Sequence, residues 1–225
     1  MPNSIRVVVA VIVALLFAAE PLSIQAAENP ALNAEVMQLS REWERIKFHV
    51  ANLDEQEKLM AVLVQKAQDI AQRYQNRPEA MIWVGITIGE QASIALENGS
   101  PIKALGLARS AKDVLEKVEK IDPVALDAGA PSTLGELYNR VPGFPIGFGD
   151  KSKARHYLQE AIANAPNGLD ANFFYGKFLY EQHEYVESMR ILKRALTLPT
   201  LSSRPIWDRS LRLAITELLG KMQRK

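Results

Sequence analysis

The chain of 225 residues contains no cysteine, which excludes disulfide bonds, thiolate chemistry, thiolate zinc sites and lipid attachment through a cysteine. It also lacks an excess of charge, because 27 Lys and Arg residues balance 26 Asp and Glu residues to a formal net charge of +1. A dedicated nucleic-acid-binding protein would carry a basic excess, so no nucleic-acid partner is expected. A chain of this length can bury a sizeable core, and 48% of its residues are hydrophobic.

Enzyme motifs are missing as well. Residues 147–152 (GFGDKS) superficially resemble a phosphate-binding loop, but Asp150 interrupts the required Gly-Lys-Ser and no strand precedes the segment. The histidines His49, His156 and His183 form no ligand pair at i, i+4. No nucleophile elbow, zincin helix or kinase motif is present. We therefore expect no catalytic residue, metal site or cofactor, and keep an uncharacterised envelope enzyme only as an alternative.

Long hydrophobic runs are scarce, and the longest lies near the N-terminus. Residues 7–19 (VVVAVIVALLFAA) follow a short start that carries Arg6. As a helix this run spans about 20 Å, short of the roughly 30 Å hydrocarbon core of a bilayer. A basic start, an apolar stretch of this length and the small residues Ala26–Ala27 are typical of a secretory signal peptide. We predict a signal peptide over residues 1–27 and one helical domain over residues 28–225.

That division implies a periplasmic or secreted protein with no membrane span after the leader is removed. An uncleaved leader that anchors the protein in the inner membrane is the alternative.

Apolar residues beyond the leader recur every three or four positions, which predicts helices. One such stripe contains Val36, Leu39, Trp43, Ile46 and Val50. Asp54 is the expected N-cap of the helix that follows. No segment alternates in the manner of a strand, so the predicted fold class is all-α.

An internal repeat predicts the architecture. Ala154, Leu158, Ala161 and Pro166 are spaced 4, 3 and 5 residues apart, and Ser188, Leu192, Ala195 and Thr200 repeat this spacing 34 residues later. The two sets are preceded by similar groups, Leu134, Gly135 and Tyr138 before the first and Tyr175, Gly176 and Leu179 before the second. This alternation of small and large residues is typical of tetratricopeptide repeats (TPRs), in which each unit is a pair of antiparallel helices.

Stacked pairs of this kind form a right-handed superhelix whose concave surface is lined by the first helix of each pair. The last pair needs a cover with a polar outer face. The segment that begins at Arg204-Pro205 carries apolar residues at helical spacing, so we predict a C-terminal capping helix there.

Residues 141–150 (VPGFPIGFGD) form an insertion between two predicted helices. Proline and glycine disfavour a helix here, yet the segment is too apolar for a solvated linker. We expect an ordered loop whose apolar side chains rest on the rest of the protein. Asp150 is the expected N-cap of the next helix.

Aromatic side chains supply the candidate binding residues. Two groups are considered, the loop residues Phe144, Pro145 and Phe148, and the residues Phe173 and Tyr180, which lie seven apart on one helix face. The second pair either packs in the core or lines the concave groove, and the sequence leaves both open.

The run LGELYNRVPGFPIGFGDKSKARHYLQEAIANAPN (134–167), followed by FLYEQHEY (178–185), resembles the T-component family of tripartite ATP-independent periplasmic (TRAP) transporters. The resemblance covers roughly residues 80–200. It implies an exported TPR-like helical protein that sits beside a substrate-binding subunit. Family members carry a lipoprotein cysteine after the leader, which this chain lacks.

Together these observations predict a periplasmic scaffold that binds a protein partner, with a periplasmic substrate-binding protein as the partner that the resemblance implies. A helical protein that binds a small apolar ligand is the alternative. The oligomeric state stays open.

Overall fold

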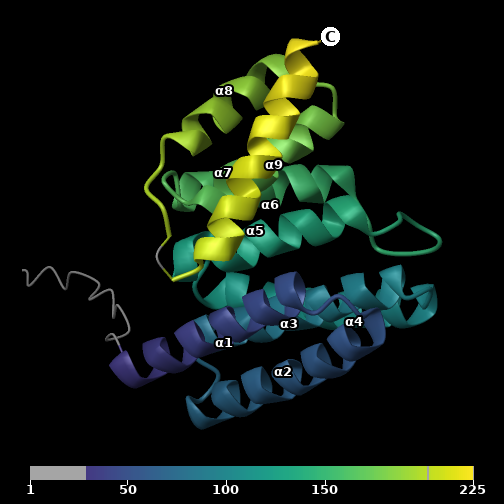
Figure 1. Cartoon of the computed structure of the whole chain (residues 1–225), viewed down its shortest axis with the longest axis vertical. Helices are drawn as coiled ribbons and strands as arrows, with labels where there is room; N and C mark the ends of the chain where they lie inside the picture. The colour runs from purple at the N-terminus through teal and green to yellow at the C-terminus, as the bar shows by residue number, and fades with distance from the viewer. Residues whose placement is uncertain (1–28, 202, 225) are drawn as a thin grey trace, which may run out of the picture.

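A computed structural model describes residues 29–201 and 203–224, so the predicted signal peptide lies outside the described residues. The described residues form nine α-helices and no β-strand, which confirms the all-α prediction (Figure 1). The helices are α1 (Pro30–His49), α2 (Leu53–Arg73), α3 (Pro78–Glu97), α4 (Pro101–Ile121), α5 (Ala125–Arg140), α6 (Lys151–Asn164), α7 (Leu169–Glu181), α8 (Tyr185–Leu196) and α9 (Pro205–Gln223). None of them is both long and apolar enough to cross a bilayer.

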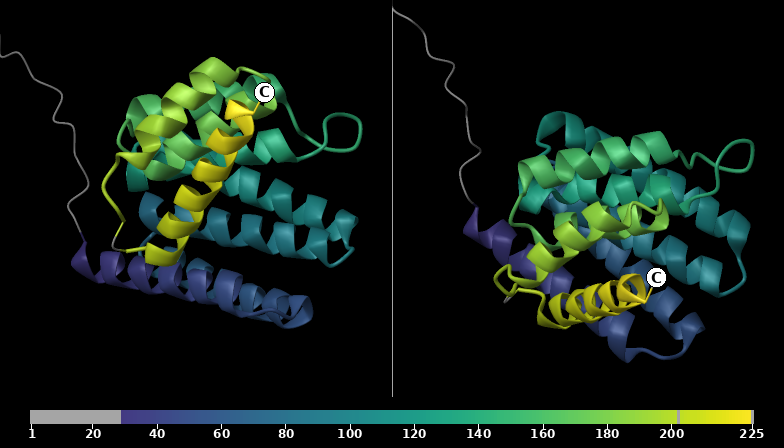
Figure 2. Two further views of the ribbon diagram at one scale, coloured as in Figure 1. Left: turned by 45° about the horizontal axis from the view of Figure 1, so that its top comes forward. Right: turned by 90° about the horizontal axis from the view of Figure 1, so that it is seen from above.

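The helices pack as antiparallel pairs, α1 with α2, α3 with α4, α5 with α6 and α7 with α8. Each first helix also contacts the first helix of the next pair, so α3 touches α1 and α5, and α5 touches α7. Figure 1 shows α1 to α4 in the lower half and α5 to α8 in the upper half. The two further views in Figure 2 show the same stack, with α9 lying across it.

In three of the helical pairs, a glycine of the first helix lies against a leucine of the second helix. A Cβ atom added to Gly135 or Gly176 would lie 2.4 or 2.5 Å from Leu158 or Leu192. The two leucines are 34 residues apart, and the two glycines belong to the similar groups that precede each repeat set. Gly85 and Leu115 make the same contact between α3 and α4, with a Cβ distance of 2.5 Å. The stacked helical pairs predicted from the sequence are therefore confirmed.

The start of α5 departs from helical geometry. Leu126, Asp127 and Ala128 have φ angles of 49°, 54° and 58°, in the left-handed region that L-residues rarely occupy. Asp122 holds the preceding turn, because its Oδ1 accepts hydrogen bonds from the backbone N–H groups of Val124 and Ala125. This turn redirects the chain between α4 and α5 and places Leu126 beside the concave surface.

The predicted N-caps have different outcomes. Asp150 caps α6 as expected, since its Oδ1 accepts hydrogen bonds from the backbone N–H groups of Ser152 and Lys153 at 2.8 and 3.0 Å. The prediction of Asp54 as the cap of α2 is wrong. Asn52 is the cap, and its Oδ1 accepts from the N–H of Glu55 at 2.9 Å. Asp54 already lies inside the first turn of the helix.

The inserted loop is held at its base and exposed at its tip. The N–H of Gly149 donates to the carbonyl of Pro142 at 2.9 Å, and Phe148 packs edge-on against Tyr138 with ring centroids 5.4 Å apart. Phe144 and Ile146, however, are 94% and 66% exposed. The expectation that the apolar side chains of the loop rest on the protein therefore holds for Phe148 and is wrong for the tip. The backbone hydrogen bonds at the base close the loop without help from the tip side chains.

The C-terminal helix α9 caps the stack as predicted. Its apolar residues Leu211 and Ile215 pack in one cluster with Leu192 of α8 and with Leu169 and Phe173 of α7. Its N-terminal end also reaches α1, at the opposite end of the sequence (Figure 1). This second contact closes the stack and shapes the groove described next.

Candidate functional site

The concave surface of the stack is a groove with a cavity volume of about 820 Å³. Its walls come from the first helix of every pair, α1, α3, α5 and α7, together with part of α4 and the residues just before and at the start of α9. Most of the lining is apolar and includes Val36, Ile82, Ile86, Ala108, Leu137, Phe173 and Phe174. This groove is the concave surface that the repeat pattern predicts. The volume of the groove falls in the range of pockets that bury small ligands.

Aromatic rings close the groove where α9 meets α1. The ring of Trp207 in α9 lies 5.1 Å from that of Trp43 in α1, in an edge-on arrangement, and Trp83 of α3 lies 6.2 Å from Trp43. Lys47 extends over Trp43 with its Nζ 5.6 Å from the ring centroid, and the same Nζ lies 2.5 Å from Oε1 of Glu90. The ammonium group is thus fixed by a carboxylate and by ring faces.

Polar contacts reinforce this closure. The buried carboxylate of Glu44 accepts a 2.7 Å hydrogen bond from the backbone N–H of Trp207. Asp170 of α7 accepts from the indole Nε1 of Trp207 at 2.6 Å and also from the guanidinium of Arg204. We call the contacts of Arg204 and Trp207 with Glu44, Trp43 and Asp170 the clasp. The clasp joins the first, the seventh and the ninth helix.

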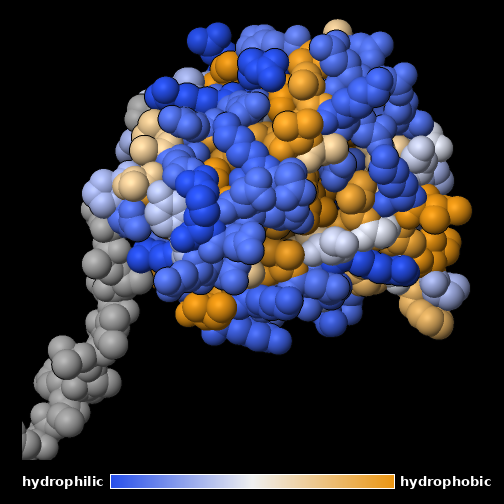
Figure 3. All heavy atoms as spheres, turned by 90° about the horizontal axis from the view of Figure 1, so that it is seen from below, coloured by the Kyte–Doolittle hydropathy of each residue, from blue (hydrophilic) through white to orange (hydrophobic). Residues whose placement is uncertain are grey.

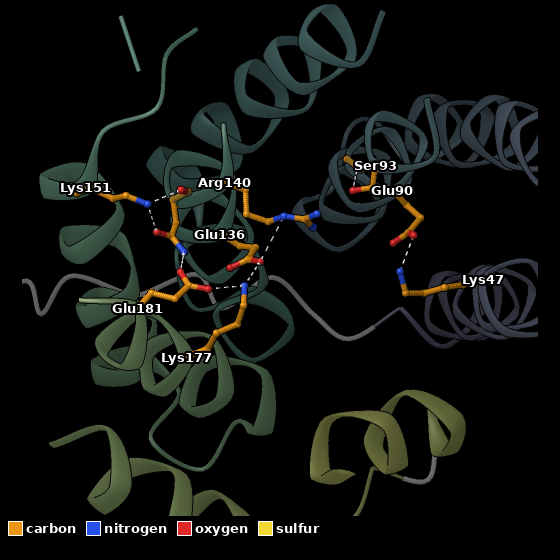
Figure 4. A network of polar contacts seen from close by, with 10 residues as sticks. Lys47, Glu90, Ser93, Glu136, Arg140, Lys151, Lys177 and Glu181 are labelled. Atoms are coloured by element: carbon orange, nitrogen blue, oxygen red, sulfur yellow. Dashed lines mark hydrogen bonds and ion pairs between the residues drawn. The ribbon is translucent and has the colours of Figure 1, made fainter. Parts of the chain in front are cut away.

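A second cluster of polar side chains is centred on α5 (Figure 4). Oε1 of Glu136 accepts a 2.7 Å hydrogen bond from Lys177 of α7, and Arg140 lies one turn further along α5, 3.9 Å from the same oxygen. Figure 4 shows Arg140 extending from α5 in the direction of Glu90 of α3. Glu136, Arg140 and Glu90 all line the groove.

Three side chains in the groove wall each keep one buried polar atom without a hydrogen-bond partner. These atoms are the indole Nε1 of Trp43, Oγ of Ser132 and Oε2 of Glu136. Only one other buried side-chain atom in the described part of the chain is in this state, Oδ1 of Asn172. A buried polar group without a partner costs about 1–3 kcal/mol, so three in one cavity are a notable concentration.

The predicted binding residues separate into different places. Phe173 lines the groove, whereas Tyr180 packs against Tyr185 at 5.6 Å in the cluster between α7, α8 and α9 and is absent from the groove wall. Phe144 and Pro145 lie exposed at the loop tip, and Phe148 packs on Tyr138. The sequence did not single out Ser132 or Glu136, although polar residues at i and i+4 among the apolar residues of α5 are a signal that could have found them.

Tyr138 connects the loop to the second helix of the preceding pair. Its hydroxyl donates a 2.7 Å hydrogen bond to Oε1 of Glu116 in α4. Burial raises the pKa of Tyr138 well above its usual range, and the hydrogen bond to Glu116 raises it further. Burial alone would raise the pKa of Glu116, but the hydrogen bonds from Tyr138 and Lys112 hold that pKa below its ordinary value. This pair stabilises the fold and lies outside the groove.

Nothing in the described residues assembles a metal centre, since no group of three or more His, Asp or Glu side chains is placed to hold an ion there. The histidines are scattered. His156 is exposed beside Glu160, and Nδ1 of His183 lies 2.7 Å from the hydroxyl of Tyr185.

Exposed apolar side chains gather at one end of the groove. Leu96 at the end of α3, Ile102 in the first turn of α4, and Phe144 and Ile146 of the loop are all exposed, and we call them the rim patch. Leu96 and Ile146 also line the groove. Figure 3 shows hydrophobic side chains gathered on the right of one face, the side on which the loop projects in Figure 1.

Comparison with known protein families and with curated proteins gives no match. Among solved structures, the chain is similar to a thermophilic TPR protein from Thermus thermophilus, with a TM-score of 0.56 and 18% sequence identity over 84% of this chain and 82% of that protein. At this identity the likeness shows the fold alone. The chain therefore has an all-α helical-repeat fold of the TPR type.

Proposed function

We propose that the protein is a scaffold of the cell envelope that binds a protein partner through the rim patch. The observation that carries the proposal is the loop tip, where Phe144 and Ile146 face solvent while the loop base is fixed by hydrogen bonds and by Phe148. Exposed apolar clusters on a rigid support are typical of protein-binding surfaces, because little entropy is lost when they bind. The TPR-type fold supports a role in protein interaction as well.

Export is the second part of the proposal and rests on the N-terminal sequence. The apolar run at 7–19 and the small residues Ala26–Ala27 support cleavage after residue 27. Cell fractionation and the mass of the mature protein test this part: a periplasmic protein that begins at residue 28 supports it, and a full-length protein in the membrane fraction supports the uncleaved anchor instead.

The narrower form of the proposal names the partner as the substrate-binding protein of a TRAP-type transporter. The support for it is the resemblance over residues 134–167, which contains the loop of the rim patch. In this form the protein is an accessory subunit of solute uptake and carries out no chemistry itself.

Site-specific photocross-linking in living cells tests the proposal. A photoreactive phenylalanine analogue replaces Phe144 in one variant and Val186 in another, because Val186 is also apolar and exposed but lies on α8. We expect a cross-linked partner from position 144 and none from position 186. Equal cross-linking at both positions, or none at position 144, would contradict the proposal.

The identity of the captured protein tests the narrower form separately. A TRAP substrate-binding protein supports it. A different envelope protein, captured at position 144 alone, supports the scaffold and refutes the transporter association.

A further inference from the structure

The interior of the groove, beyond the rim patch at its end, has the composition of a small-molecule site. Its apolar walls enclose about 820 Å³, and the clasp closes it where α9 meets α1. A pocket of this size with a few polar groups among apolar side chains is the usual form of a ligand site. The clasp limits the groove on one side, which favours a compact ligand over a long protein segment.

The unpartnered atoms define the polar part of the ligand. Nε1 of Trp43 is a donor, Oε2 of Glu136 is an acceptor, and the hydroxyl of Ser132 can act as either. Ser132 and Glu136 lie one turn apart on α5, so one ligand group can donate to the carboxylate and accept from the hydroxyl, as a hydroxyl or an amide does. Small side-chain rotations, which commonly accompany binding, would present these atoms to the ligand.

The charges in the wall select against a charged ligand. Lys47 is paired with Glu90 and Arg204 with Asp170. Arg140 lies near Glu136, whose other oxygen atom has no partner. An anion would meet the carboxylate of Glu136, and a cation would meet the guanidinium of Arg140, because both side chains line the groove. A neutral polar group avoids both repulsions.

From this arrangement we infer that the groove binds a neutral amphiphile, an apolar molecule that carries a hydroxyl or amide group. The apolar body packs between α3, α5 and α7, and the polar group lies beside Ser132 and Glu136, one turn apart on α5. The inference uses the inside of the groove and does not depend on the protein partner proposed above.

Binding of four ten-carbon compounds to the full-length protein tests this inference. The neutral probes are 1-decanol and decanamide, and the charged probes are decanoate and decylammonium. Binding is read from intrinsic fluorescence, because all three tryptophans of the chain, Trp43, Trp83 and Trp207, line the groove, and calorimetry gives the affinity. We expect both neutral compounds to bind at least about tenfold more tightly than either charged one. Failure of the neutral compounds to bind, or equal binding of a charged one, would overturn the inference.

Substitutions locate the site. Ser132→Ala and Glu136→Gln should each weaken decanol binding by about fivefold to tenfold, the effect of one lost hydrogen bond. Gly89→Leu should abolish it, because Gly89 lines the groove and a side chain there would extend into open space. Gly106→Leu is the matched control, since Gly106 is an exposed helical glycine with equal space outside the groove. Unchanged binding in Gly89→Leu, with the chain folded by circular dichroism, would place the ligand elsewhere and refute the site.

Discussion

The carboxylate of Glu44 in α1 accepts a hydrogen bond from the backbone N–H of Trp207, 163 residues further along the chain, at the third residue of α9. The first N–H groups of a helix have no partner within it, so a carboxylate there satisfies an unpaired donor and interacts favourably with the helix dipole. Helix α9 has no side-chain N-cap of its own at Arg204. Glu44 therefore supplies from the first helix a contact that the last helix lacks.

This contact predicts the effect of removing Glu44. Glu44→Ala leaves the partly buried N–H of Trp207 without a partner and should lower the free energy of unfolding by about 2 kcal/mol. Urea denaturation followed by circular dichroism measures the change. Glu42→Ala is the control, because Glu42 forms only a surface pair with Lys66, and it should cost less than about 0.5 kcal/mol. Equal effects of the two substitutions would show that the contact between Glu44 and Trp207 does not stabilise the fold.

The close approach of Gly135 to Leu158 predicts that a single methyl group there is destabilising. Gly135→Ala would place a Cβ 2.4 Å from the leucine side chain, and the forced repacking should cost about 1–3 kcal/mol. Gly106→Ala meets no atom within 4 Å and should stabilise α4 by about 0.5–1 kcal/mol. The midpoints of thermal unfolding should therefore shift in opposite directions, and a shift in the same direction would contradict the packing of α5 on α6.

The loop contains one structural and one exposed phenylalanine, and substitution should separate them. Phe148→Ala removes the ring that packs on Tyr138 and should lower the free energy of unfolding by about 2 kcal/mol. Phe144→Ala should change it by less than about 0.5 kcal/mol, because the side chain is almost fully exposed. Chemical denaturation of the two variants measures both free energies of unfolding. A large loss of stability in Phe144→Ala would mean that the loop tip is packed in solution.

The raised pKa of Tyr138 predicts an alkaline dependence of stability. In the unfolded chain this tyrosine loses its proton near pH 10, whereas in the folded protein burial and Glu116 keep it protonated to higher pH. The unfolded state therefore gains relative stability as pH rises above about 10. Thermal unfolding between pH 9 and 11 should become less pH-dependent in Tyr138→Phe, which should also be less stable than the parent at pH 7 because the hydrogen bond to Glu116 is lost. An unchanged dependence would show that Tyr138 ionises alike in both states.

Local patterns predicted much of the fold. The contacts of Gly135 with Leu158 and of Gly176 with Leu192 follow from the repeat pattern of small and large residues, because each contact joins the two neighbouring helices of one pair. The cap at Asp150 follows from the residue type next to a helix start. Such features depend only on residues near one another in the sequence.

Features that depend on the path of the whole chain could not be predicted. The contact of Trp207 with Trp43 requires the curvature summed over four helical pairs, which no local pattern encodes. Likewise Phe173 and Tyr180 share one predicted helix face and both pack in the cluster of α7, α8 and α9, but only Phe173 also lines the groove. The exposure of Phe144 and Ile146 was missed because hydrophobicity alone does not distinguish a buried loop from a binding surface.

The groove is closed only because α9 packs against α1, and a double-mutant cycle between Trp43 and Trp207 measures that contact most directly. Trp43→Leu, Trp207→Leu and the double variant are unfolded in urea beside the parent. The edge-on ring contact predicts a coupling of about 0.5–1.5 kcal/mol, so the double variant should lose less stability than the sum of the two single losses. Strictly additive losses would show that α9 does not close the stack on α1.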